Sequence, residues 1–358
     1  MRIVQIIDSL EAGGAERMAV NYANALAQEI SFSGLVVTRN EGALLNEINS
    51  KCSYLFLNKK QTIDVQAVFE LRQYIVTHKV AIVHAHGTSF FIAVLLKISY
   101  PKIKVIWHEH YGARVNQTAS ANAVLILCSL FFNAIFVVNK QLLTWVKQKT
   151  FCKNAYYIPN FTAFDIQKKG TTILQGNDGQ RIVCVANLKH PKNHLALLRA
   201  FKDLNVPNWT LHLIGEEYDD DYSKAIRDYI KLENLEEFVF LYGAKRDIEN
   251  ILSQATIGVL SSTAEGFPVC LLEYGLAGLP TLSTNVGSCS EVVADNLSGL
   301  LFDPNNEDEL KNQLYKIISD KPLRDRFGLY LQQSVLRKYS KSIILKQLIA
   351  KYEEIKND

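Results

Sequence analysis

Two glutamates in the second half of the sequence, Glu265 and Glu273, have the spacing to grip hydroxyl groups of a bound ligand. Each carboxylate accepts two hydrogen bonds, so one could hold a hexose and the other a ribose. The apolar run at 257–260 predicts a strand, and Pro268 predicts a helix start, because proline fits the first helical position. The free N–H groups of that helix could bind a pyrophosphate. The residues between the first glutamate and the helix interior are Gly266, Phe267, Pro268 and Val269.

The alternative interpretation of the two carboxylates is structural. Glu265 could be an acidic cap of the helix, and Glu273 could be a solvated helix position. The second half of this alternative is weak, because apolar residues flank Glu273 on both sides. These neighbours are Leu271, Leu272, Leu276 and Ala277.

Two adjacent glycines, Gly13 and Gly14, follow the first apolar run at 2–7 and open a helix predicted over 15–28. Glycine lets the backbone approach a ligand closely, and a helix N-terminus favours anions. The G-x-G-x-x-G fingerprint of dinucleotide sites is absent. A phosphate-binding loop and a plain strand–helix turn therefore both stay open.

Four histidines form two pairs, His84 with His86 and His108 with His110, at the ends of successive predicted strands. A period of two puts the members of each pair on one face of a strand, so all four could meet. A zinc site is one interpretation, since imidazole suits zinc. No carboxylate or thiolate at ligand spacing accompanies them, so we expect no metal and a structural role for His86.

The acidic run Asp219-Asp220-Asp221 contains the D-x-D pattern that holds a divalent metal in some enzymes. It lies in a loop that enters a predicted helix. Acidic residues stabilise the first turn of a helix without any metal. We therefore predict a helix entry here and no metal site.

Strand-like and helix-like segments alternate along the whole chain, which predicts doubly wound parallel sheets. An irregular stretch at 161–179 divides them into two Rossmann-like α/β domains, 1–160 and 180–335, and 336–358 forms a C-terminal helix that could pack back on the first domain. Ligands of such sheets bind beyond the carboxyl ends of the strands, so two facing domains would enclose a ligand. The predicted strands are 2–7, 34–37, 54–57, 81–85, 105–107, 134–138, 156–158, 182–186, 210–214, 238–241, 257–260, 281–283 and 300–302.

Length and composition agree with this division. The chain has 358 residues, which suits two domains. A hydrophobic fraction of 48% with only 18 Gly and 8 Pro excludes disordered and fibrous classes. A net charge of +3 excludes a strong nucleic-acid footprint. The six cysteines form no C-x-x-C pair, which is typical of buried reduced thiols in a cytosolic protein.

The membrane signals of the sequence are weak. No signal peptide precedes the first strand, so we expect a cytoplasmic location. The apolar stretch at 119–138 is interrupted by polar residues, which favours a buried helix to about 132 followed by a strand over a membrane span. Four lysines after this stretch could form a basic rim beside anionic lipid on the inner face of the cytoplasmic membrane, or could belong to an ordinary solvated helix. They are Lys140, Lys147, Lys149 and Lys153.

The segment from Glu265 to Glu273, E-G-F-P-x-x-x-x-E, resembles the signature of the retaining family 4 glycosyltransferases, which have the GT-B fold. Other segments are similar to motifs of that family in the same order along nearly the whole chain. They are the glycine loop at 13–17, the phosphate-binding segment at 187–194, and the donor-domain segments at 284–291 and 298–302.

The resemblance implies a role for each matching residue. Glu265 would contact the hydroxyls of the donor sugar, Glu273 the nucleotide ribose, and His110 the region of the reacting sugar. Lys192 would neutralise the departing pyrophosphate, as a lysine can. Asn187 would line the donor site where many members have an arginine, so Lys189 or Arg246 could supply a second charge. The catalytic residues implied are Glu265, His110 and Lys192. The donor-binding residues implied are Gly14, Asn187, Lys192, Glu265, Gly266, Phe267, Pro268, Val269 and Glu273, and the phosphate loop is Gly13 with Gly14.

The resemblance also implies a reaction. A hexose would pass with retention from a nucleotide diphosphate sugar, a UDP-sugar above all, to a glycan or lipid-linked acceptor of a bacterial surface polysaccharide. No metal or other cofactor would be needed. Two alternatives stay open, a nucleotide-sugar 2-epimerase of the same fold and a non-catalytic module that binds sugar nucleotides. The sequence does not indicate the oligomeric state.

Overall fold

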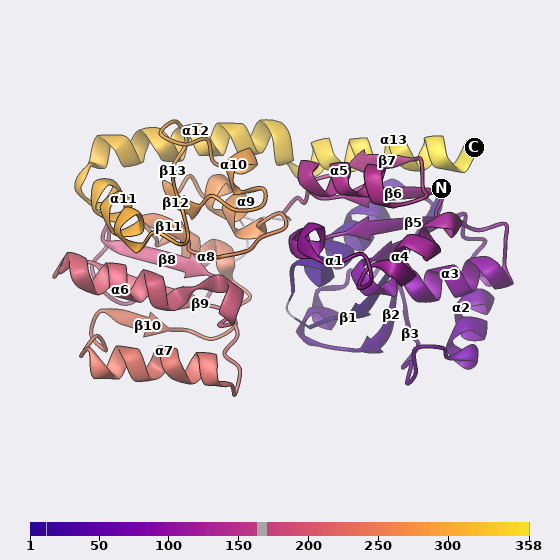
Figure 1. The fold of residues 1–358 in the computed structure, drawn as a ribbon, viewed down its shortest axis with the longest axis horizontal. Helices are drawn as coiled ribbons and strands as arrows, with labels where there is room; N and C mark the ends of the chain where they lie inside the picture. The colour runs from indigo at the N-terminus through magenta and orange to yellow at the C-terminus, as the bar shows by residue number, and fades with distance from the viewer. Residues whose placement is uncertain (12, 163–169, 358) are drawn as a thin grey trace. The chain divides into compact units, whose positions relative to one another are not determined.

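The computed structural model describes residues 1–11, 13–162 and 170–357. It divides into two compact units, the first comprising Met1–Phe161 and Lys341–Asp358 and the second Thr162–Ser340. Each unit is built on one parallel sheet with helices on both faces (Figure 1). The predicted fold class, two Rossmann-like α/β domains, is confirmed.

The first unit holds a seven-stranded sheet in the order β3-β2-β1-β4-β5-β6-β7. Its central strands are apolar runs that are mostly buried on both faces, as parallel strands covered by helices require, whereas the two edge strands are only partly buried. The strand order reverses between β1 and β4. The strands are β1 (Arg2–Ser9), β2 (Phe32–Asn40), β3 (Ser53–Phe56), β4 (Ile82–His86), β5 (Lys104–Glu109), β6 (Ala134–Val137) and β7 (Ala155–Tyr157). The helices are α1 (Gly14–Glu29), α2 (Val65–Thr77), α3 (Phe90–Ser99), α4 (Ala123–Cys128), α5 (Lys140–Lys149) and α13 (Lys341–Asn357).

The second unit holds a six-stranded sheet in the order β10-β9-β8-β11-β12-β13, which reverses between β8 and β11. Its strands are β8 (Arg181–Val185), β9 (Thr210–Ile214), β10 (Val239–Leu241), β11 (Ile257–Leu260), β12 (Thr281–Thr284) and β13 (Leu300–Phe302). Its helices are α6 (His194–Leu204), α7 (Asp221–Leu232), α8 (Ile248–Ser253), α9 (Val269–Leu276), α10 (Cys289–Val292), α11 (Glu307–Ser319) and α12 (Lys321–Tyr339).

The apolar stretch at 119–138 folds as α4, a short 3₁₀ helix and β6. The predicted sequence of helix and strand is therefore right, but the helix is only half-buried. Leu125 and Cys128 face the core, whereas Val124 and Leu127 are exposed. Among the described residues, no helix combines the length and the apolar composition that crossing a membrane requires.

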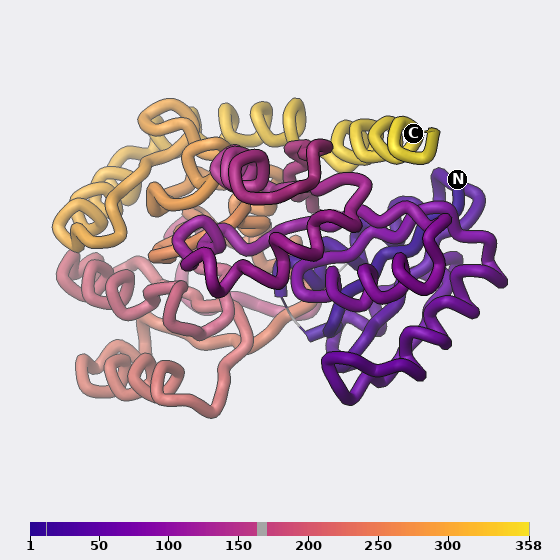
Figure 2. Tube along the Cα trace, turned by 45° about the vertical axis from the view of Figure 1, so that its right-hand side comes forward, coloured from indigo at the N-terminus to yellow at the C-terminus, as the bar shows by residue number. Residues whose placement is uncertain are grey.

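The two units divide at 161 and again at 340. Helix α12 runs uninterrupted to Tyr339, so the expected boundary at 335 falls inside it. Helix α13, the C-terminal helix that could pack back on the first domain, belongs to the first unit and contacts α1. Figures 1 and 2 show α13 over the elements of that unit. Within the expected linker, residues 163–169 lie outside the described part of the chain. The backbone N–H of Thr172 donates to Asp247 of the second unit at 2.8 Å, so the described linker residues from 170 onward pack with that unit.

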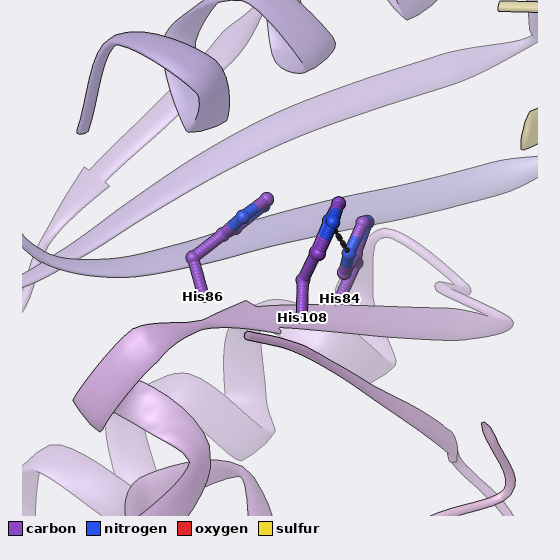
Figure 3. A group of neighbouring side chains, drawn as sticks. All are labelled: His84, His86 and His108. Atoms are coloured by element: carbon purple, nitrogen blue, oxygen red, sulfur yellow. Dashed lines mark hydrogen bonds between the residues drawn. The ribbon is translucent and has the colours of Figure 1, made fainter. Parts of the chain in front are cut away.

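The core of the first unit holds the four histidines, called here the histidine cluster. Hydrogen bonds cross between the strands: His84 Nε2 lies 3.2 Å from His108 Nδ1, and His86 Nδ1 lies 2.9 Å from His110 Nε2. Along each strand the rings lie over one another, with centroids 4.4 Å apart for His84 and His86 and 4.2 Å for His108 and His110. Figure 3 shows the three fully buried members projecting from the same face of the sheet.

Two further side chains extend this network. Gln5 of β1 places Oε1 2.8 Å from His86 Nε2, and Tyr352 of α13 places its hydroxyl 2.6 Å from His84 Nδ1. Gln5 Nε2 and the Tyr352 hydroxyl are 3.4 Å apart, which closes the chain. The last helix is thereby bonded to the centre of the first sheet.

Burial keeps these imidazoles neutral. Removal from water disfavours the charged form, so the pKa of His84, His86 and His108 falls well below the ordinary value, and that of His110 falls to about 3. In the second unit, burial lowers the pKa of two further histidines to about 4. They are His194 and His212.

These shifts predict acid-sensitive folding. Because the folded pKa values lie below the unfolded value of about 6.5, the unfolded chain binds more protons below that pH, and stability present at pH 7 is lost as the pH falls. Each such histidine contributes up to about 1.4 kcal/mol per pH unit. Urea unfolding between pH 7 and 5 measures this slope. His212→Gln should reduce it, and the exposed control His190→Gln should not; equal stability at pH 7 and pH 5 would contradict the expectation.

Candidate functional site

The loops that follow β8 and β11 meet at the point where the strand order of the second sheet reverses. Helices leave the two strands in opposite directions there, which opens a crevice at the carboxyl end of a doubly wound sheet. The loops are bonded to each other: Thr263 N–H donates to the Pro191 carbonyl at 2.8 Å, and Ser261 Oγ donates to the Lys192 carbonyl at 2.9 Å. These bonds fix the backbone on both sides of the candidate site.

Lys192 and Glu265 form an ion pair between these loops. Lys192 Nζ lies 2.6 Å from Glu265 Oε1, and Ser262 Oγ donates to the same carboxylate oxygen at 2.6 Å. The side chains are 21% and 10% exposed. Burial is the largest single effect and would lower the pKa of Lys192, but the Glu265 carboxylate, together with Cys270 and Cys184, raises the pKa above its ordinary value, so the lysine stays a cation. The Lys192 cation is thus held at the carboxyl end of the sheet.

Helix α9 begins directly after the loop that carries Glu265. Pro268 is the residue before its first helical position, one place earlier than expected, and no side chain of the described residues caps this helix N-terminus. Uncapped N–H groups together with the helix dipole favour a phosphate. The geometry thus offers two sources of positive potential, the helix end and Lys192.

Glu273 lies one turn inside α9 and is buried, with 9% of its surface exposed. Cys270, three positions earlier on the same face, has a pKa raised by its own burial and then by Glu265 and Glu273, while Lys192 lowers it. All three charged groups therefore lie around one side of the start of α9. The alternative interpretation of Glu273 as a solvated helix position is therefore wrong, since the side chain is buried.

Tyr274 and Gly287 fix this arrangement, and the sequence analysis did not single out either role. The buried Tyr274 hydroxyl accepts from Val185 N–H at 2.8 Å and donates to the Val259 carbonyl at 3.1 Å, which ties α9 to β8 and β11. Gly287 has φ +55°, and a Cβ there would lie 2.1 Å from the Glu265 carbonyl oxygen. An aromatic residue in an apolar helix is typical of any core, so no sequence signal marked Tyr274.

Asn187, the position where an arginine was expected, joins two loops. Its Oδ1 accepts from Glu216 N–H at 3.0 Å, and its Nδ2 donates to the Tyr218 hydroxyl at 3.3 Å. Of the two candidates for a second charge, Lys189 lies on the same loop as Lys192 and is exposed. Arg246 follows β10 at the edge of the sheet.

Gly13 and Gly14 belong to the first unit, at the start of α1. The Glu16 carboxylate folds back over this helix start, and a Cβ on Gly13 would lie 2.1 Å from it. A side chain at position 13 would displace this carboxylate. A phosphate at this loop would have to share the helix end with a carboxylate. Ala12, in the same motif, lies outside the described residues.

His110 follows β5, also in the first unit, and is partly exposed. Its Nε2 is bonded to His86, and its Nδ1 is buried beside Asn160. The loop that follows is anchored by an ion pair between the fully buried Glu109 and Arg114, which the sequence analysis missed.

The acidic run at 219–221 and the histidine cluster are hydrogen-bonded to other protein groups. Asp220 caps α7 by accepting from Ser223 N–H at 2.8 Å, so the predicted helix entry is confirmed. Among the described residues, the one group close enough to share a metal is His84, His86 and His108. Hydrogen bonds to protein already engage both nitrogens of His84 and His86. A metal would have to break them.

Comparison with known proteins agrees with this geometry. The model of the family "Glycosyltransferase Family 4" matches residues 12–163, and that of "Glycosyl transferases group 1" matches residues 169–333.

Curated relatives and solved structures span the chain. A UDP-Gal:alpha-D-GlcNAc-diphosphoundecaprenol alpha-1,3-galactosyltransferase of Escherichia coli is 23% identical over 87% of this chain and 86% of its own. The amylovoran biosynthesis glycosyltransferase AmsD of Erwinia amylovora is 21% identical over 97% and 98%. The Anabaena protein HepE, solved with UDP and glucose, superposes with a TM-score of 0.84 at 19% identity over 99% of each chain.

The two family models together extend from residue 12 to residue 333 and so reach both sheets. The first model contains the glycine loop at 13–17, and the second contains the motifs between 187 and 302. The chain belongs to the family 4 glycosyltransferases and is an enzyme with their GT-B fold.

Proposed function

We propose that this enzyme transfers a hexose, with retention of configuration, from a UDP-sugar to a glycan or lipid-linked acceptor in the synthesis of a bacterial surface polysaccharide. The observation that carries the proposal is the Lys192–Glu265 pair beside the uncapped start of α9. The UDP-galactose transfer named for the Escherichia coli relative and the UDP and glucose bound to HepE support the donor class. The amylovoran relative supports the pathway.

The reaction breaks the bond between the sugar C1 and the phosphate oxygen and forms a bond between C1 and the acceptor oxygen. Negative charge grows on the departing phosphate, where Lys192 and the α9 N-terminus would stabilise it. The departing phosphate takes the acceptor proton. Glu265 would hold the sugar hydroxyls and Glu273 the ribose, with Lys189 better placed than Arg246 for a second charge. The first unit would bind the acceptor.

His110 would act as a neutral group near the reacting sugar. Burial lowers its pKa to about 3, so the imidazole is uncharged at neutral pH. It can orient a partner by hydrogen bonding, and the leaving phosphate keeps the role of proton acceptor.

The two glutamates should fail in different ways. Glu265→Gln weakens an acceptor beside a centre that becomes cationic, so the loss appears in turnover. Glu273→Gln weakens the grip on the ribose, so affinity for free UDP falls by about 1.5–3 kcal/mol. Calorimetric titration with UDP and steady-state kinetics measure both. The exposed control Glu237→Gln should change neither. Loss of UDP affinity in Glu265→Gln alone would reverse the two roles.

Transfer should continue in excess EDTA, because Lys192 and the N-terminus of α9 would stabilise the departing phosphate without a metal ion. The measurement is the transfer rate after chelation and again after Mn²⁺ or Mg²⁺ is restored. Loss on chelation with recovery on restoration would refute metal independence.

We also propose peripheral attachment to anionic membranes through an apolar patch of the first unit. Its members are at least 38% exposed, and the hydrogen bond from Phe151 N–H to Ser129 Oγ at 2.9 Å brings the last member beside α4. None of the four nearby lysines makes an ion pair with a described residue. The patch is Val124, Leu127, Leu130, Phe131 and Phe151, and the lysines are Lys140, Lys147, Lys149 and Lys153.

Each lysine near an anionic surface contributes about 1 kcal/mol, so attachment should be reversible and weaken in salt. Flotation with phosphatidylglycerol vesicles at low and high salt tests this. Lys147→Gln with Lys149→Gln should reduce flotation, whereas Lys224→Gln with Lys231→Gln on α7 should not. Absence of binding to these vesicles at low salt would refute attachment.

A further inference from the structure

Two cations at the carboxyl end of the first sheet have no partner in the described part of the chain. They are Arg39, near the end of β2, and Lys59, three residues after β3. Neither side chain forms a hydrogen bond or an ion pair with a described residue. Lys59 is only 7% exposed, yet its amino nitrogen is not one of the fully buried polar atoms that lack a partner. The amino group therefore reaches the surface from a stem that protein covers.

The position of Lys59 is unfavourable for a charged group. Burial disfavours the ammonium form and the charge of Arg39 repels it, and both effects lower the pKa of Lys59. A buried charge without a counter-ion costs stability, so such a group is rare unless it serves a ligand. An anion that binds between the two cations would relieve both penalties.

Two carboxylates nearby are already occupied by other groups. Asp8 and Asp64 raise the pKa of Lys59, but less than burial and Arg39 lower it. The two carboxylate oxygens of Asp8 accept from the hydroxyls of Thr38 and Thr88. Asp64 caps the N-terminus of α2. The cations therefore remain available to an external anion.

These cations lie at the edge of the sheet where ligands bind. The strand order reverses between β1 and β4, and doubly wound sheets bind ligands beyond the carboxyl ends of their strands. Lys59 N–H donates to the Thr38 carbonyl at 2.6 Å, which brings the segment after β3 beside the end of β2. His110 follows β5 at the same edge, and β2, β1 and β4 lie between β3 and β5. At about 4.8 Å per strand, the ends of β3 and β5 are about 19 Å apart.

We propose that Lys59 and Arg39 form a subsite for a phosphate group of an extended acceptor. Two cations match the roughly two negative charges of a phosphate at neutral pH, and a guanidinium binds phosphate through two parallel hydrogen bonds. The separation from the end of β5 exceeds a single sugar ring, so this phosphate is remote from the reacting hydroxyl. Its source is either a phosphate on a glycan chain or the diphosphate that joins a glycan to a lipid. The assignment to an acceptor rests on the proposed function, whereas the phosphate subsite does not.

Calorimetric titration of the full chain saturated with UDP tests the subsite, because UDP occupies the phosphate site proposed at Lys192. The probes are glucose 6-phosphate for a glycan phosphate, farnesyl diphosphate for a lipid diphosphate, and glucuronate as a singly charged comparator. At least one phosphate probe should bind about tenfold more tightly than glucuronate, and the tighter of the two identifies the source. Absence of binding by both phosphate probes, or tighter binding of glucuronate, would overturn the proposal.

Substitutions locate the binding. Lys59→Met keeps an apolar stem and Arg39→Gln keeps a polar one, and each should weaken phosphate binding by about tenfold or more. The control is Lys51→Gln, an exposed lysine at the amino end of the same sheet, which should bind as the wild type does. The thermal midpoint of Lys59→Met should stay or rise, because an unpaired buried charge is removed. A lowered midpoint with unchanged phosphate affinity would give Lys59 a structural role and refute the subsite.

Transfer assays separate this proposal from the proposed function. If Lys59→Met loses phosphate affinity but the wild-type enzyme transfers no hexose from a UDP-sugar, the subsite stands and the proposed function is refuted. If the wild-type enzyme transfers hexose equally well to matched acceptors with and without a phosphate, the role of the subsite in acceptor recognition is refuted and the proposed function stands.

Discussion

The charges of Lys192 and Glu265 compensate each other in a site that is largely withdrawn from water. Removing one partner of such a pair typically costs about 3–5 kcal/mol because the other is left uncompensated. The pair exists because β8 and β11 are neighbours in a parallel sheet, so that the loops after them meet. Backbone bonds between the loops and the Tyr274 hydroxyl under α9 keep the two charges in contact.

If the proposed function is right, the Lys192–Glu265 pair is closed in the absence of donor and opens when a donor binds. A pyrophosphate that arrives at the start of α9 competes with Glu265 for Lys192. Glu265, released from the lysine, becomes available to sugar hydroxyls. The binding of the leaving group and the grip on the transferred sugar would thus be coupled through one ion pair, with Ser262 Oγ as the remaining donor to the carboxylate.

The sequence predicted the strands well because parallel strands covered on both faces must be short apolar runs. It also predicted Asp220 as a helix entry, since capping depends on local residues alone. The chain of bonds through Gln5 could not be predicted, because Gln5 and Tyr352 are 347 positions apart and meet only once α13 packs on the first unit. The expected boundary at 335 falls within α12, which continues to Tyr339 and packs against α9 and α10.

Replacing Lys192 tests the role of the Lys192–Glu265 pair most directly. Lys192→Ala, checked for folding by its thermal midpoint, should lower kcat/KM by about 2–4 kcal/mol and weaken UDP binding, because the departing phosphate loses its cation. Lys192→Arg should recover part of the loss, and the exposed control Lys224→Ala should behave as the wild type. A folded Lys192→Ala enzyme with unchanged turnover and unchanged UDP affinity would contradict the central role given to the Lys192–Glu265 pair.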